Sequence, residues 1–174
     1  MSNRRHIISI LVENRFGVLA RVSSLIAGRG FNIDSLTVGE TEDPSLSRMT
    51  IVTRGDEMII EQITKQLNRL IDVVKVTDLT ETTHVERELV LVKVSAPNPQ
   101  VRSEIVQVVD VFRAKVVDIS GATVTIEVTG DNEKVEALIG MLEPFGIREI
   151  ARSGSIALGR EKMPRRVAET VRAA

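Results

Sequence analysis

The sequence predicts an α+β fold made of two successive units, each with the order β-α-β-β-α-β. Short apolar runs rich in valine and isoleucine alternate with stretches whose apolar residues recur every three or four positions. These are the patterns of strands and of amphipathic helices. The same order of runs occurs twice, on either side of the polar stretch Thr80–Glu88. Each unit is therefore expected to be ferredoxin-like, with both helices on one face of an antiparallel sheet.

The first unit, residues 1–80, begins with an apolar run of strand length at Ile7–Val12. A helix is expected at Gly17–Gly28, because its apolar residues fall on one helical face and Gly28 can end it. The remaining elements are two strands joined by a polar loop, a second helix and a closing strand. They are expected at Asn32–Val38, Arg48–Thr53, Asp56–Ile71 and Val73–Leu79.

The second unit, residues 84–158, repeats this order with different letters. Its strands and helices are expected at Leu89–Ser95, Gln100–Phe112, Lys115–Ile119, Thr123–Thr129, a helix capped by Asp131, and Ile147–Ala151. The strand Thr123–Thr129 alternates apolar and polar residues, as a strand with one buried face does. Thr80–Glu88 is interpreted as the linker between the units, and residues 159–174 as a basic tail.

Composition excludes several classes of function. No cysteine is present, which rules out disulfides, thiolate metal ligands and cysteine nucleophiles. Lys plus Arg (23) nearly balance Asp plus Glu (24), so the chain as a whole does not attract nucleic acid. The four phenylalanines, without any Trp or Tyr, are too few for a base-stacking sheet. The N-terminal apolar run is too short for a membrane span and resembles no signal peptide, so a cytoplasmic location is expected.

No catalytic or metal-binding motif stands out. The two histidines, His6 and His84, form no ligand pair with matching spacing, and no phosphate-cradling glycine loop is present. Glu86 and Glu88 lie beside His84, but a charged linker gives a carboxylate no desolvated surroundings. The chain is therefore expected not to be an enzyme by itself, with no catalytic residue and no metal site.

The stretch "NRFGVLARVSSLIAGRGFNIDSL", Asn14 to Leu36, carries the candidate binding site. Gly17 at the helix start would leave the backbone N–H groups of Val18 and Leu19 open to an anion such as a carboxylate. Asn14 and Asn32 each offer donors and an acceptor, and Leu19 and Ile33 could line an aliphatic side chain. These six residues could bind a free amino acid. The spacing is equally compatible with a capped turn that binds nothing.

Three longer stretches resemble one family. "VENRFGVLARVSSLIAGRGFNIDSLTVGETEDPSLSRMTIV", "HVERELVLVKV" and "IARSG" are similar to the small regulatory subunits of acetolactate synthase (acetohydroxyacid synthase). The resemblance extends from about Ile7 to Leu158, nearly the whole chain. The first unit resembles an ACT domain, a module that binds amino acids at interfaces between domains.

The resemblance implies a function for the chain. Two copies would join through their ACT domains, with Asn14 and Gly17 of one chain facing Asn32 and Ile33 of the other around a bound valine. The homodimer would activate a separate catalytic subunit and let valine inhibit it in branched-chain amino-acid biosynthesis. Thiamine diphosphate, magnesium and FAD would belong to that catalytic subunit, and none to this chain. The second unit would dock the partner or support the dimer. An alternative is a free-standing ACT-domain sensor that regulates another enzyme.

Overall fold

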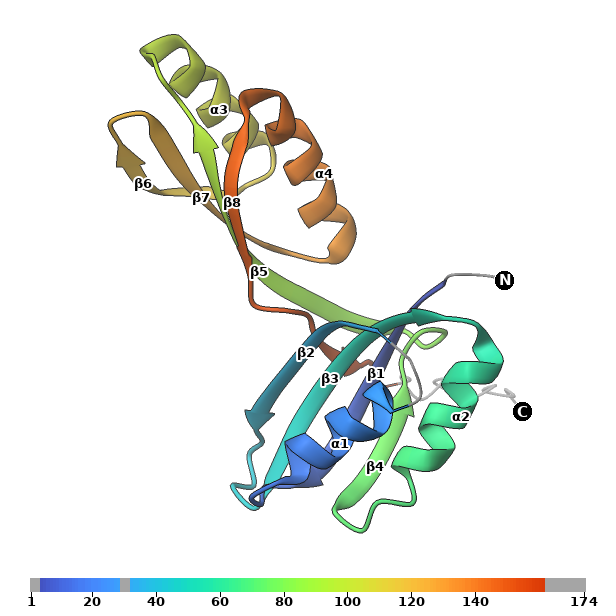
Figure 1. The fold of residues 1–174 in the computed structure, drawn as a ribbon. Coiled ribbons are helices and arrows are strands. Elements are labelled where there is room, and N and C mark those ends of the chain that lie inside the picture. The colour runs from blue at the N-terminus through green and yellow to red at the C-terminus, as the bar shows by residue number, and fades with distance from the viewer. Residues whose placement is uncertain (1–3, 29–31, 162–174) are drawn as a thin grey trace, which may run out of the picture.

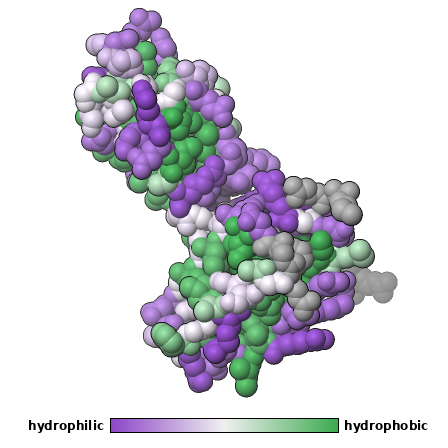
Figure 2. Space-filling model, viewed as in Figure 1, coloured by the Kyte–Doolittle hydropathy of each residue, from purple (hydrophilic) through white to green (hydrophobic). Residues whose placement is uncertain are grey.

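The structure is a computed structural model that describes residues 4–28 and 32–161. It confirms two α+β units, which form two lobes joined by a narrow waist (Figures 1 and 2). Each unit packs two helices on one face of its sheet (Figure 1). Each lobe has its own aliphatic core, one built around Ile10, Val22 and Ile51 and the other around Val92, Ile126 and Leu138.

The first unit has the predicted order of elements. They are β1 (Arg4–Glu13), α1 (Val18–Ala27), β2 (Ile33–Glu40), β3 (Leu46–Gly55), α2 (Glu57–Leu67) and β4 (Val73–Asp78). The sheet order is β2-β3-β1-β4, with antiparallel neighbours. Helix α2 is shorter than expected, because Asn68 caps it by donating from Nδ2 to the carbonyl of Thr64 at 2.9 Å.

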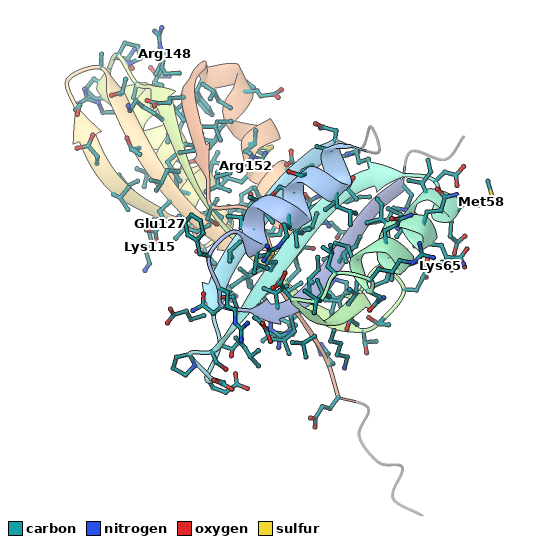
Figure 3. All side chains as sticks on the ribbon, turned by 60° about the horizontal axis from the view of Figure 1, so that its bottom comes forward. Met58, Lys65, Lys115, Glu127, Arg148 and Arg152 are labelled. Atoms are coloured by element: carbon teal, nitrogen blue, oxygen red, sulfur yellow. The ribbon has the colours of Figure 1, made fainter. Side chains whose placement is uncertain are left out.

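The second unit repeats the topology. Its elements are β5 (His84–Ser95), α3 (Pro99–Val111), β6 (Lys115–Ser120), β7 (Thr123–Gly130), α4 (Asn132–Leu142), the short 3-10 helix η1 (Glu143–Phe145) and β8 (Ile147–Arg152). The strand order β6-β7-β5-β8 corresponds strand by strand to that of the first sheet. Neighbours on β6 and β7, such as Lys115 and Glu127, lie side by side (Figure 3).

Three of the four helices that the structure describes begin with a side-chain cap. Asp56, Asn98 and Asp131 each accept a hydrogen bond from a backbone N–H in the first turn of α2, α3 and α4. Such caps satisfy donors that have no partner inside the helix. Helix α1 differs, because its N-cap is Gly17 and no side chain caps it.

The connection between the units differs from the prediction. Strand β5 begins at His84, so the second half of the predicted linker, His84–Glu88, is part of a strand. An unpredicted strand, β9 (Ile156–Gly159), follows β8 and pairs with the first residues of β5. Strand β5 and the chain that leads from β8 into β9 run between the second unit and the first (Figure 1). There Ala157 packs with Ile7 and Leu79 in a third, small apolar cluster.

This connection covers the first sheet on the face opposite α1 and α2. Ile7, Ser9, Thr50 and Val52 point toward that face and are at most 5% exposed. The first unit therefore has three layers, helices, sheet and the β5–β9 ribbon, and the third layer is contributed by the second half of the chain. Among residues 4–28 and 32–161, no helix is long and apolar enough to cross a membrane.

Candidate functional site

The N-terminus of α1 is open where Gly17 stands. Gly17 has a φ of +82°, a left-handed conformation that side chains rarely adopt. A Cβ atom built there would meet no other atom within 4 Å. The glycine is therefore required by its backbone conformation, and the space beside it is free for a small ligand.

The first helical turn offers fewer free donors than the sequence predicted. The N–H of Val18 donates to the carbonyl of Arg15 at 3.4 Å, so the expectation of an open Val18 N–H is wrong. The Val18 side chain is buried in the first core. Leu19 has no acceptor within the helix for its N–H, and its side chain is 45% exposed. Leu19 is thus the residue of this turn that can meet a ligand.

Asn14 joins the turn before α1 to the end of β2. Its Nδ2 donates to Glu40 Oε1 at 3.1 Å and to the carbonyl of Pro44 at 3.0 Å. Its own N–H donates to the carbonyl of Ser45 at 2.7 Å. These bonds use the donors of the amide and leave Oδ1 as the group that can accept from a ligand's ammonium.

Asn32 and Ile33 lie at the other end of the same elements. Asn32 Nδ2 donates to Asp34 Oδ1 at 3.2 Å, and its carbonyl accepts from Thr53 Oγ1 at 2.6 Å. Ile33 begins β2 and is partly buried against the first core. The ten residues of α1 span about 15 Å and the eight of β2 about 26 Å. One chain therefore does not bring Asn32 to Asn14 and Gly17.

The carboxylates near the unit boundary are engaged in ion pairs. Glu86 forms a bidentate pair with Arg5, and Glu88 Oε2 lies 3.5 Å from a guanidinium nitrogen of Arg152. Burial raises the pKa of Glu86, but the hydrogen bonds from Arg5 and Ser155 and the charge of Arg5 outweigh it and lower that pKa. A carboxylate held ionised in this way suits a structural contact better than a proton donor.

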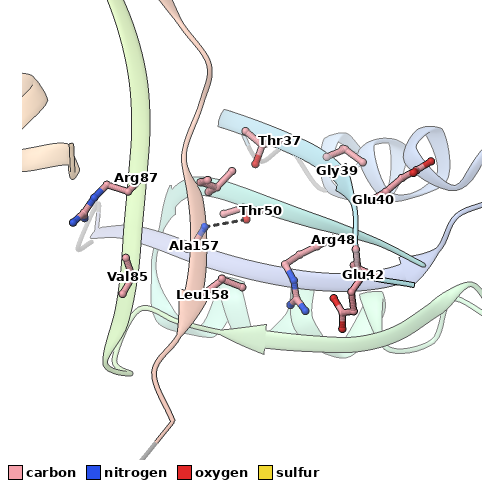
Figure 4. Close-up of a pocket in the computed structure, with 13 residues that line it drawn as sticks. Thr37, Gly39, Glu40, Glu42, Arg48, Thr50, Val85, Arg87, Ala157 and Leu158 are labelled. Carbon is pink, nitrogen blue, oxygen red and sulfur yellow. Dashed lines mark hydrogen bonds between the residues drawn. The ribbon is translucent and has the colours of Figure 1, made fainter. Parts of the chain in front are cut away.

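A hollow of about 490 Å³ lies on the face of the first sheet that points away from α1 and α2. Thr37, Arg48 and Thr50 line it from β2 and β3, while Val85 and Leu158 come from β5 and β9 (Figure 4). None of the six predicted site residues lines it. No sequence pattern predicted this hollow, because one of its walls is the unpredicted strand β9. Within residues 4–28 and 32–161, no group of three or more His, Cys, Asp or Glu could hold a metal ion.

In a comparison with known protein families, each of the two units matches a family of acetolactate synthase small subunits. Residues 8–75 match the family described as the AHAS small subunit-like ACT domain, and residues 87–161 match the family described as the small subunit of acetolactate synthase.

Individual relatives cover most of the chain. The acetolactate synthase small subunit of Aquifex aeolicus is 55% identical over 158 residues, which is 91% of this chain and 82% of that protein. A probable acetolactate synthase small subunit of Methanothermobacter thermautotrophicus is 55% identical over 89% of this chain and 92% of its own length. The crystal structure of the acetolactate synthase small subunit from Thermotoga maritima is also similar, with 47% sequence identity and a TM-score of 0.79. The match covers 92% of this chain and 99% of that chain. The chain therefore belongs to the family of acetolactate synthase small subunits.

Proposed function

We propose that this chain is a regulatory subunit of acetolactate synthase. Two copies pair through their first units, the pair activates a separate catalytic subunit, and valine bound between the copies lowers the activity. The catalytic subunit carries thiamine diphosphate, magnesium and FAD. This chain contributes no catalytic residue; it binds the effector and changes the behaviour of its partner.

The observation that supports this proposal most directly is the position of β2. Among the described residues, β2 pairs with β3 alone and forms one edge of the first sheet. An unpaired edge strand invites pairing with another strand. Pairing of β2 with its own copy around a two-fold axis would be antiparallel, so the start of one β2 would lie beside the end of the other.

That pairing would assemble the candidate site. Asn32 and Ile33 stand at the start of β2, and Asn14 is hydrogen-bonded to Glu40 at its end. Across the two-fold axis each chain would bring its Asn32 and Ile33 to the Asn14 and Gly17 of the other. The residues that are far apart in one chain would form two equivalent sites in the pair.

Each site residue would then have a distinct role for a small aliphatic amino acid. The ligand's carboxylate would occupy the open space at Gly17 and accept from the Leu19 N–H, where the helix dipole favours negative charge. The Asn14 Oδ1 would accept from the ammonium group. Asn32 would add polar contacts from the second chain, and Leu19 and Ile33 would contact the aliphatic side chain.

Substitution of Gly17 tests the position of the carboxylate. Gly17→Asp places a fixed carboxylate at the helix N-terminus, where it should repel the ligand and abolish valine inhibition. Gly17→Asn is the matched control, because Asn has nearly the same size, tolerates a positive φ and carries no charge. The measurement is activity of the reconstituted holoenzyme against valine concentration, with circular dichroism to verify folding. Activation of the catalytic subunit without valine should persist in both variants.

Substitution of Asn32 tests the contribution of the second chain. Asn32→Ala should weaken valine binding by about 1–3 kcal/mol, or roughly ten- to a hundredfold. Asn68→Ala, which removes an exposed amide at the end of α2, is the control and should leave binding unchanged. Calorimetry measures both affinities. Folded Gly17→Asp and Asn32→Ala variants that bind valine as tightly as the wild type would move the site away from α1 and β2.

A further inference from the structure

We propose that Ser35 and Thr37 of β2, together with Ser155, form a latch that fixes the second unit to the effector strand and carries the effect of valine to it. The inference rests on the proposed function, because it takes β2 as the strand that responds to the ligand. The latch adds three positioning residues to the six predicted site residues. It also provides a path, which the sequence did not predict, from the effector site to the second unit.

Ser155 is held by β2 from both sides of its peptide. Its N–H donates to Ser35 Oγ at 3.0 Å, and its carbonyl accepts from Thr37 Oγ1 at 2.8 Å. Ser155 is 4% exposed, so these bonds are shielded from water. The two side chains thereby satisfy both backbone groups of a residue that stands between β8 and β9.

Gly154 permits this close approach. Its φ is +83°, and a Cβ atom there would lie 2.6 Å from Ser35 Oγ and 2.9 Å from Thr37 Cγ2. Both distances are shorter than Cβ atoms tolerate in proteins. Gly154 is therefore required for its backbone conformation and for the space it leaves to β2.

A charged contact closes the latch from the other side. The guanidinium of Arg5 on β1 donates to Ser155 Oγ at 3.3 Å and also pairs with Glu86 on β5. The Glu86 side chain is 9% exposed and the Arg5 side chain 22%. Ser155 thus links two strands of the first sheet to both strands that lead into the second unit, β5 and β9.

The place of the latch on β2 gives it a regulatory role. Ser35 and Thr37 lie between Ile33 at one end of β2 and Glu40, the partner of Asn14, at the other. Only Ser153 and Gly154 separate Ser155 from the end of β8 in the second sheet. A displacement of β2 on ligand binding would therefore move Ser155 and, through β8, the second unit. Ligand binding can shift the second unit only if the two states differ in such contacts.

Two kinds of variant open the latch. The double substitution Ser35→Ala with Thr37→Val removes both hydrogen-bonding hydroxyls with little change of shape. Gly154→Ala pushes the connection away from β2. Thr125→Val on β7 is the matched control for the loss of a hydroxyl from a sheet. Gly146→Ala is the control for backbone strain, because Gly146 also has a positive φ, of +85°, but its nearest contact is 3.8 Å away.

The position of the second unit is measured first, in the full-length chain without ligand. The natural chain has no cysteine, so spin labels can be placed on exposed Glu61→Cys in α2 and Gln107→Cys in α3. Dilution with unlabelled chain isolates the distance within one copy. The wild type and both control variants should give one narrow distance distribution, and both latch variants a broader one.

Regulation is measured next, in the reconstituted holoenzyme. In both latch variants the valine concentration for half inhibition should rise about fivefold or more, in the range of ordinary allosteric coupling, while calorimetry finds valine binding unchanged within about twofold. Activity without valine should stay close to that of the wild type. The control variants should behave as the wild type in all three measurements.

Several results would overturn the inference. A narrow distance distribution in both latch variants would show that the latch does not position the second unit. Unchanged valine inhibition with a broadened distribution would show that the signal takes another route. A wild-type holoenzyme that ignores valine would refute the proposed function and the signalling role with it, while the label distances would still decide whether the latch positions the second unit.

Discussion

The two sheets have the same topology, but their open faces differ. On the first sheet the face opposite the helices is covered by β5 and β9, and Ile7, Thr50 and Val52 are at most 4% exposed. On the second sheet no other segment among residues 4–28 and 32–161 covers the corresponding face, and Leu89 and Leu91 are 40% and 37% exposed. The exposed ion pair between Lys93 and Glu149 lies on that uncovered face.

This difference shows that a repeated topology does not make two units equivalent. A sheet with helices on one side can have its other side in water, as the second unit does. The first unit instead buries hydroxyl groups such as Ser9 and Thr50 beneath a ribbon from the second half of the chain. The packing of the first unit therefore depends on the second, and a change at their contact should affect both.

The largest effect is expected from a charge placed beneath the ribbon. Ala157 on β9 is 2% exposed, so Ala157→Asp would bury an unpaired carboxylate against Ile7 and Leu79. The free energy of unfolding should fall by about 3–5 kcal/mol. The loss is not larger, because β9 can detach from the sheet and bring the charge into water. Ala151→Asp on exposed β8 is the matched control and should change stability by less than about 0.5 kcal/mol. Urea unfolding of both variants measures the difference, and equal losses would contradict the covered face.

A smaller effect is expected from Glu86→Gln, which leaves Arg5 without its counter-charge between the units. The free energy of unfolding should fall by about 1–3 kcal/mol at neutral pH. Because the folded-state pKa of Glu86 is lowered, the pair stabilises the fold above the unfolded pKa of about 4.3 and loses that contribution as the pH falls through the folded pKa.

The pH dependence and a surface pair provide the checks on this prediction. The stability difference between the wild type and Glu86→Gln should be full at pH 7 and shrink below about pH 4. Glu149→Gln removes the exposed partner of Lys93 on the second sheet and should have little measurable effect. A difference that stays constant down to pH 3 would assign the loss to packing and not to charge.

The smallest effect is expected at Thr50. Its Oγ1 accepts from the N–H of Ala157 at 3.4 Å, a long bond between β3 and β9 (Figure 4). Thr50→Val keeps the shape but removes the acceptor, at a cost of about 0.5–1.5 kcal/mol. Hydrogen exchange at the Ala157 amide should become faster, while exchange in α3 and α4 stays as in the wild type. Unchanged exchange at Ala157 would mean that this bond contributes nothing to holding the ribbon.

The sequence by itself determined the elements of both units. Period-2 and helical patterns located the strands and helices, and Asp131 correctly marked the start of α4, because these signals act within a few residues. The sequence also placed Gly17 at the start of α1, but the left-handed conformation of Gly17 and the bond from the Val18 N–H to Arg15 came only from the structure. The binding role of the six residues near the start of α1 and the start of β2 stays a prediction.

Only the tertiary structure decided how the units meet. The four residues of β9 are too few for a periodic pattern, and the charged start of β5 has the composition of a linker. Their strand conformation comes from pairing with each other and packing on the first sheet. The bond between Ser35 and Ser155 joins residues 120 positions apart. Such contacts depend on the complete fold, because they join residues that are distant in the sequence and leave no pattern within a few residues of either one.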